Sequence, residues 1–100
     1  MLVYNTTYHV EDDVHDNFLI WLKESYIPAV EKEGTLKAPL LCRLLSHHHE
    51  GTSYALQWKV EDSAQLHRWH SLQGERFTKE LVQMFNEKVV GFPTLMEVIE

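Results

Sequence analysis

Apolar and polar residues are arranged along this chain in two different periods, which predict strands and helices in turn. The stretch Val3–Val10 is short and rich in Val, Thr and Tyr, so it is predicted to be a strand. From Val14 to about Val30 the apolar residues recur every three or four positions, which predicts a helix. Asp12 or Asp13 is placed to cap its start, and Pro28 predicts a kink or break near its end.

The second half of the chain repeats this order. The stretches Pro39–His48 and Ser53–Val60 read as strands, and the short connection with its glycine favours a hairpin. Ser63 is expected to cap a second helix, whose apolar face continues to about residue 85. The stretch Lys88–Ile99 is predicted to be the last strand. Pro93 lies within it and favours an edge position, because a central strand needs that amide.

The predicted order is therefore strand, helix, strand, strand, helix, strand. That order is the α+β, ferredoxin-like βαββαβ sandwich, with an antiparallel sheet in the order 4-1-3-2 and both helices on one face. A chain of 100 residues is long enough for one such domain, so we expect residues 1–100 to form a single ferredoxin-like domain.

Strand parity predicts which side chains face the helices, because neighbouring residues of a strand point to opposite faces. In the two central strands the aromatic and aliphatic set is expected under the helices. The open face would then carry Asn5, Thr7, His9, Gln57 and Lys59. This face is either exposed to solvent or covered by a second subunit. Because both edge strands carry apolar residues on both parities, we favour a homodimer that closes an α+β barrel.

Composition and charge exclude several classes of partner. The formal net charge is −6 and Lys and Arg do not cluster, so a nucleic-acid partner is disfavoured. The beginning of the chain lacks the pattern of a signal peptide, and no stretch approaches the ~20 apolar residues that span a bilayer, so we expect no membrane partner. The single cysteine, Cys42, fits a reducing compartment. We expect a cytoplasmic protein with no cofactor.

The most conspicuous polar run is His47-His48-His49. In a strand, His47 and His49 would point the same way with a spacing that suits two ligands of one metal, and His67 or His70 could add a third. The run also lies where the hairpin is expected to turn, where polar residues usually meet water. We interpret it as a hairpin tip and expect no metal site.

The polar residues of the open face are the better candidates for a binding site. Asn5, Thr7, His9 and Gln57 could form a hydrogen-bonding floor, and Tyr26 could place a hydroxyl near its mouth. The first hypothesis is a homodimeric protein that binds a small molecule between the sheet face and its partner, as a cofactor-independent enzyme or as a binding protein. The alternative is a non-catalytic structural or interaction module whose open face is only a dimer interface.

The segments "VYNTTYHVEDD", "FLIWLKESYIPAV", "GTSYALQWKVED" and "EKVVGFPTLMEVI" together resemble an uncharacterised family of short bacterial proteins, a domain of unknown function. This resemblance implies a fold and no activity. The segment "FLIWLKESYIP" is more distantly similar to the dimeric α+β barrel superfamily, whose members often carry an aromatic residue and then His-x-Pro. That superfamily includes cofactor-free oxygenases, lactone isomerases and haem-degrading enzymes. Here Tyr26 stands in the place of the histidine, so an activity that uses the histidine is not implied.

Overall fold

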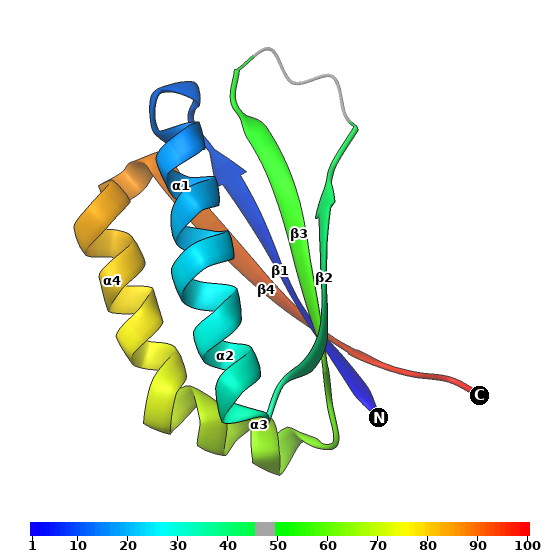
Figure 1. Cartoon of the computed structure of the whole chain (residues 1–100). Coiled ribbons are helices and arrows are strands. Elements are labelled where there is room, and N and C mark those ends of the chain that lie inside the picture. The colour runs from blue at the N-terminus through cyan, green and yellow to red at the C-terminus, as the bar shows by residue number, and fades with distance from the viewer. Residues whose placement is uncertain (46–49) are drawn as a thin grey trace.

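The computed structural model describes residues 1–45 and 50–100, and it has the predicted order of elements (Figure 1). The strands are β1 Leu2–Val10, β2 Lys37–Arg43, β3 Thr52–Val60 and β4 Val89–Glu97. The first helical arm consists of η1 Asp12–Val14, α1 His15–Trp21, η2 Leu22–Tyr26 and α2 Ile27–Glu33. The second consists of α3 Ser63–Trp69, η3 His70–Gly74, α4 Glu75–Phe85 and η4 Asn86–Lys88.

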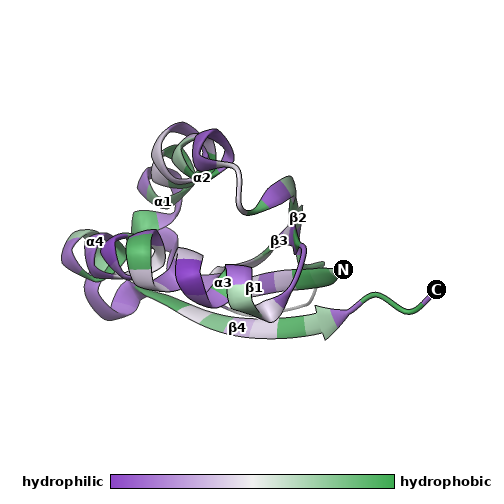
Figure 2. Ribbon diagram, turned by 90° about the horizontal axis from the view of Figure 1, so that it is seen from below, coloured by the Kyte–Doolittle hydropathy of each residue, from purple (hydrophilic) through white to green (hydrophobic). Residues whose placement is uncertain are grey.

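The four strands form one antiparallel sheet in the order β2-β3-β1-β4, which confirms the predicted topology. Both helical arms lie on the same side of this curved sheet, as the end-on view of Figure 2 shows. Among the described residues, no helix lies over the other face. The architecture is therefore the ferredoxin-like βαββαβ sandwich, with Pro93 on an edge strand as expected.

The hydrophobic core fills the space between the sheet and the two arms. Its fully buried members come from every layer, and the three tryptophans are all among the buried residues: Trp21, Trp58 and Trp69. In the central strands the core contains Tyr8, Val10, Tyr54, Leu56, Trp58 and Val60. Parity therefore assigned the helix-facing side of β1 and β3 correctly.

Of the two outcomes predicted at Pro28, a kink or a break, the break does not occur. The helix is not broken there, because a π-helical turn, η2, precedes the proline and Pro28 lies in the first turn of α2. The amide of Ile27 donates to the carbonyl of Leu22, five residues back, so the helix widens and continues. Asp12 and Asp13 do not cap the arm by a side-chain hydrogen bond; Asp13 instead forms an ion pair with Lys88.

The second arm begins one residue earlier than predicted. Asp62 is the N-cap rather than Ser63, because its backbone is extended and its carboxylate accepts from the amide of Gln65 at 2.8 Å. This arm also contains a π-helical turn, η3, in which the amide of Glu75 donates to the carbonyl of His70. Gly74 ends the turn against the Trp69 ring: a Cβ at this glycine would lie 2.9 Å from Cζ3 of Trp69.

The second strand is displaced from its predicted bounds. It begins at Lys37, two residues early, contains an irregularity between Lys37 and Leu40, and ends at Arg43. The predicted strand end at residues 46–48 and the histidine run His47–His49 fall within 46–49, outside the described residues. No helix of the described residues is long and apolar enough to cross a membrane.

Candidate ligand-binding cavity

A cavity of about 1090 Å³ lies on the helix-facing side of the sheet, between the second helical arm and strands β1 and β4. It is slightly larger than most small-molecule pockets, which measure roughly 300–1,000 Å³. Its floor is the inward face of β1, which presents three hydroxyl side chains in alternate positions: Tyr4, Thr6 and Tyr8. Its walls are mainly apolar and include Trp69, Phe77, Leu81 and Pro93.

The two π-helical turns meet at this cavity. Tyr26, the last residue of η2, lines it from the first arm, and His70 and Gly74, the two ends of η3, line it from the second. A π-helical turn widens a helix and moves the side chains that follow it, and such turns are frequent at functional sites. Each arm therefore contributes at least one lining residue from a π-helical turn, beside others such as Phe77 and Leu81 from regular α-helix.

The phenols of the cavity interact with one another. Burial raises the pKa of both Tyr8 and Tyr26 well above the usual range of tyrosine. The neighbouring Tyr4 phenol further raises the pKa of Tyr8, and Tyr8 and Tyr4 do the same for Tyr26. Polar interaction between the two hydroxyl groups raises the pKa of Tyr26 further, whereas Thr6 and Tyr26 partly offset the rise in the pKa of Tyr8. Both phenols are neutral at physiological pH.

Aromatic rings hold Tyr26 in place. Its ring stacks on Trp21 at 5.2 Å and meets the edge of Phe77 at 5.0 Å. The indole Nε1 of Trp21 donates to a carboxylate oxygen of Glu80 at 2.7 Å, which joins α1 to α4. Because its neighbours on both arms are fixed, the Tyr26 hydroxyl has a defined position beside Tyr8.

Charged residues line only the rim. Glu11, Glu87 and Lys88 contribute to the cavity, and all three are exposed. Lys88 is engaged by Asp13, and its carbonyl accepts from the amide of Glu11 at 3.0 Å. The buried part of the cavity is therefore lined by aromatic, aliphatic and hydroxyl groups.

The five site residues predicted from the sequence do not lie together. Tyr26 lines the cavity on the helix side, whereas Asn5, Thr7, His9 and Gln57 have the opposite parity and lie on the open face. There Asn5 pairs across the sheet with Gln57, and Thr7 with Ala55. The sheet separates these four residues from Tyr26, so they cannot share a pocket with it.

The open-face residues form their own contacts. The amide nitrogen of Asn5 donates to Oγ1 of Thr7 at 3.2 Å, and Asn5 is only 8% exposed. His9 lies at the end of β1, with its Nδ1 3.1 Å from Oγ of Ser53 and its ring against the backbone of Gly51. Gly51 has a φ of +77°, and a Cβ there would lie 2.8 Å from Nε2 of His9, so a glycine is required.

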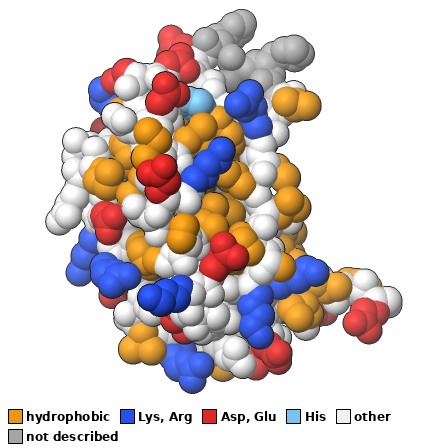
Figure 3. All heavy atoms as spheres, in the orientation of Figure 1, with side chains coloured by type: hydrophobic (Ala, Val, Ile, Leu, Met, Phe, Trp, Pro, Cys, Tyr) orange, Lys and Arg blue, Asp and Glu red, His pale blue; other side chains and the backbone are white. Residues whose placement is uncertain are grey.

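Around this polar centre the open face is apolar. Cross-strand register places four exposed hydrophobic residues on it, with Phe92 (59% exposed) opposite Thr7 and Leu40 (54% exposed) opposite Gln57. Val90 and Met96 are the other two. Hydrophobic side chains also reach the molecular surface among charged ones in the view of Figure 3, including along the side of the sheet where β2 lies.

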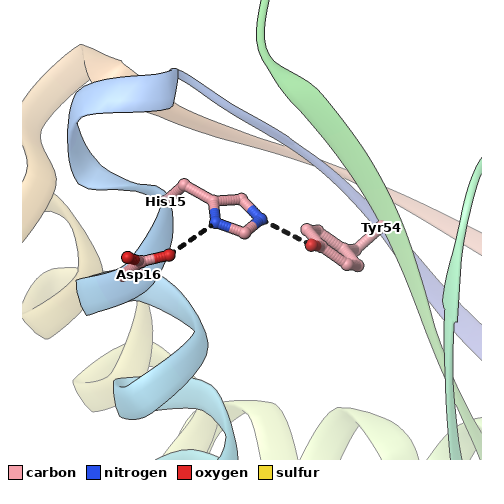
Figure 4. A network of polar contacts seen from close by, with 3 residues as sticks. All are labelled: His15, Asp16 and Tyr54. Atoms are coloured by element: carbon pink, nitrogen blue, oxygen red, sulfur yellow. Dashed lines mark hydrogen bonds and ion pairs between the residues drawn. The ribbon is translucent and has the colours of Figure 1, made fainter.

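A second polar network lies apart from the cavity. Figure 4 shows His15, the first residue of α1, reaching toward β3, where its Nε2 lies 2.6 Å from the Tyr54 hydroxyl. Its Nδ1 lies 3.0 Å from a carboxylate oxygen of the exposed Asp16. The Arg43 guanidinium lies over the Tyr54 ring at 5.7 Å. None of these residues lines the cavity, and the network ties the start of α1 to the sheet.

Strand parity predicts that Tyr4, Thr6 and Tyr8 lie under the helices, but it does not predict a cavity beside them. A signal was present: three consecutive inward positions of a central strand carry hydroxyl groups, which a filled core does not require. No signal marked the His15–Tyr54 contact, which joins residues 39 positions apart. Across residues 1–45 and 50–100, no group of three or more His, Cys, Asp or Glu side chains is arranged to hold a metal ion.

The fold and the cavity together define a small ferredoxin-like protein with a pocket that lies between its helices and the sheet and opens to the surface. Residues 1–99 match the family model described as Domain of unknown function (DUF4286), and the chain belongs to this family. The resemblance noted in the sequence to a family of unknown function is thereby confirmed. No curated protein matches the chain closely enough to count as a relative.

Several solved structures share the fold. A candidate antibiotic biosynthesis monooxygenase from Deinococcus radiodurans has 18% identity and a TM-score of 0.74, over 100% of this chain and 94% of that one. An ethyl tert-butyl ether d (ethd) family protein from Bacillus halodurans has 12% identity and a TM-score of 0.72, over 99% and 100%. A dimeric ferredoxin-like protein from an uncultured marine organism has 13% identity and a TM-score of 0.66, over 99% and 96%. At these identities the similarity shows the fold.

Proposed function

We propose that this chain is a homodimeric small-molecule-binding protein whose ligand occupies the cavity between the helices and the sheet. The observation that carries the proposal is the convergence of both π-helical turns on one cavity with a hydroxyl-lined floor. A regular helix in either arm would place different side chains there. Concave, mostly apolar sites with a few polar groups are the usual form of small-molecule pockets.

The homodimer would form through the open face. The exposed side chains of Leu40, Val90, Phe92 and Met96 surround a small polar centre, and such a face is unfavourable in water. A second copy of the chain offers the same surface, and two-fold dimers are the commonest oligomers. A neighbour of the same fold is described as dimeric, which supports the proposal.

The proposed pocket is on the other side of the sheet from the one first predicted. In this arrangement Tyr26 touches the ligand, while Asn5, Thr7, His9 and Gln57 belong to the dimer interface. We also propose that the protein acts in the cytoplasm, which its single cysteine, Cys42, supports.

Two neighbouring positions of β4 allow a matched test. Gly91 faces the cavity, where an added Cβ would meet Thr6 and Tyr8 at ordinary contact distance of 3.4 Å, whereas Phe92 faces the open side. Gly91→Leu therefore places a branched side chain in the cavity beside Thr6 and Tyr8, and Phe92→Leu alters only the opposite face. Both variants can be screened against a metabolite library by thermal shift, because a ligand that binds the folded state raises Tm.

Ligands that raise the Tm of the wild type are expected to raise that of Phe92→Leu and to have no effect on Gly91→Leu. Equal shifts in both variants would show binding elsewhere and contradict the proposal. A library without any ligand for the wild type would also count against it.

A further inference from the structure

The chemistry of the cavity floor restricts the ligand. Tyr4, Thr6 and Tyr8 from β1 and Tyr26 from η2 all present hydroxyl groups, which both donate and accept hydrogen bonds. Burial raises the pKa of Tyr8 and Tyr26, so these two do not become phenolates in the physiological range. The floor therefore offers neutral donors and acceptors.

The walls restrict the shape of the ligand. The Tyr4 ring meets Trp69 edge to face with centroids 6.3 Å apart, and Tyr26 is held between Trp21 and Phe77. Gly91 leaves the Tyr8 ring uncovered from the β4 side, since it has no side chain to lie over that ring. Flat rings give the best packing against aromatic walls of this kind.

The distribution of charge restricts the ligand further. The charged lining residues Glu11, Glu87 and Lys88 are at the exposed rim, and His70 is exposed as well. Among the described residues that line the buried part of the cavity, none carries a charge at neutral pH. A charged group placed against the floor would lose its hydration without gaining a counter-ion, which is strongly unfavourable.

We propose that the cavity takes an uncharged, flat, ring-containing molecule that carries a carbonyl or hydroxyl oxygen, and that the Tyr8–Tyr26 pair binds this oxygen. This inference rests on the proposed function, because it names the ligand class of the same cavity. A pure hydrocarbon would displace water from the phenols without replacing its hydrogen bonds, and buried polar groups left unpaired are costly.

Three probes of similar shape test the ligand class. They are 2-acetylnaphthalene, which is neutral with an accepting oxygen; 2-naphthoate, which is an anion; and 2-isopropylnaphthalene, which has no polar atom. Affinities can be measured by titration calorimetry with the wild type. The ketone is expected to bind about tenfold more tightly than either of the others, equivalent to one charge-neutral hydrogen bond of about 1.4 kcal/mol.

Two tyrosine variants test whether the Tyr26 hydroxyl binds the oxygen of the ligand. Tyr26→Phe should weaken binding of 2-acetylnaphthalene about five- to tenfold and leave 2-isopropylnaphthalene unchanged. Tyr54→Phe makes the same change outside the cavity and should leave both affinities unchanged. Circular dichroism and Tm establish that each variant is folded before its affinity is compared.

The outcomes separate this inference from the proposed function. If all three probes bind equally and Gly91→Leu abolishes their binding, the cavity binds ligands but the ligand class is wrong. The ligand class is also wrong if no probe binds the wild type, while library ligands bind the wild type and do not bind Gly91→Leu. If Gly91→Leu leaves binding of every ligand intact, the proposed function itself is wrong.

Discussion

The two faces of the sheet are made of the same four strands, yet they present opposite surroundings. On the helix side, aromatic side chains such as Trp58 are almost completely buried, and part of the space remains as a cavity lined by phenols. On the open side, Asn5 and Ser53 are buried among their neighbours while Phe92 and Leu40 are exposed. Buried polar groups and exposed apolar groups, rather than apolar content, therefore distinguish the open face from the core.

The largest expected difference between the faces concerns stability. Trp58→Ala removes a core side chain on the helix side and should lower the free energy of unfolding by about 3–5 kcal/mol. Phe92→Ala removes an exposed ring, so at concentrations where the protein is monomeric the loss should stay within about 0.5 kcal/mol. Denaturant titration of both variants measures this. Similar losses would mean that the two faces are equally packed within one chain.

The next effect concerns association. Phe92→Glu places a charge in the apolar part of the proposed dimer interface and should weaken dimerisation about 100-fold, since an unpaired buried charge costs several kcal/mol. Leu72→Glu is the control, because Leu72 is 75% exposed on the helical side. Sedimentation velocity over a dilution series measures the change. A wild type that is monomeric at every concentration would refute the dimer.

A third prediction concerns pH. The folded-state pKa values of Tyr8 and Tyr26 lie above those of the unfolded chain, so above pH ~10 the unfolded state loses protons that the folded state keeps. Near neutral pH these two tyrosines should not make the free energy of unfolding depend on pH. Above pH ~10 the free energy of unfolding should fall by about 1.4 kcal/mol per pH unit for each tyrosine. Denaturant titrations from pH 8 to 11 check this against Tyr8→Phe/Tyr26→Phe, which should show a shallower decline.

The smallest effect tests the start of the second arm. Asp62→Ala removes the acceptor of the Gln65 amide and should cost about 1 kcal/mol, whereas Ser63→Ala should cost little. The adjacent positions serve as each other's controls in thermal or denaturant unfolding. A larger loss of stability for Ser63→Ala than for Asp62→Ala would show that Ser63 is the N-cap, as the sequence predicts.

The fold could be predicted from the sequence because alternation and helical spacing are local properties of the chain. The strand of Val3–Val10 and the buried parity of Tyr8 and Trp58 follow from such patterns. The π-helical turns could not be predicted in this way. Pro28 marks a disturbance in the first arm, but whether the helix breaks or widens depends on how Tyr26 packs against the other arm.

The candidate site was less predictable than the fold. Parity states that Tyr4 and Tyr8 face inward, but it does not state whether the space beside them is filled, because that depends on the distance between the helices and the sheet. The sequence likewise predicts one site for Tyr26, Asn5 and His9, although the sheet separates Tyr26 from the other two. Caps are also decided by backbone geometry, which distinguishes Asp62 from Ser63 only in three dimensions.

We propose that the helix side of the sheet binds a ligand and that the open side binds a second copy of the chain. A crystal structure of the wild type grown with 2-acetylnaphthalene tests both parts at once. We expect the probe between α4 and β4, with its oxygen within hydrogen-bonding distance of the Tyr8 or Tyr26 hydroxyl, and the open faces of two copies packed together. A probe bound on the open face against Phe92, with the cavity filled by protein side chains, would contradict it.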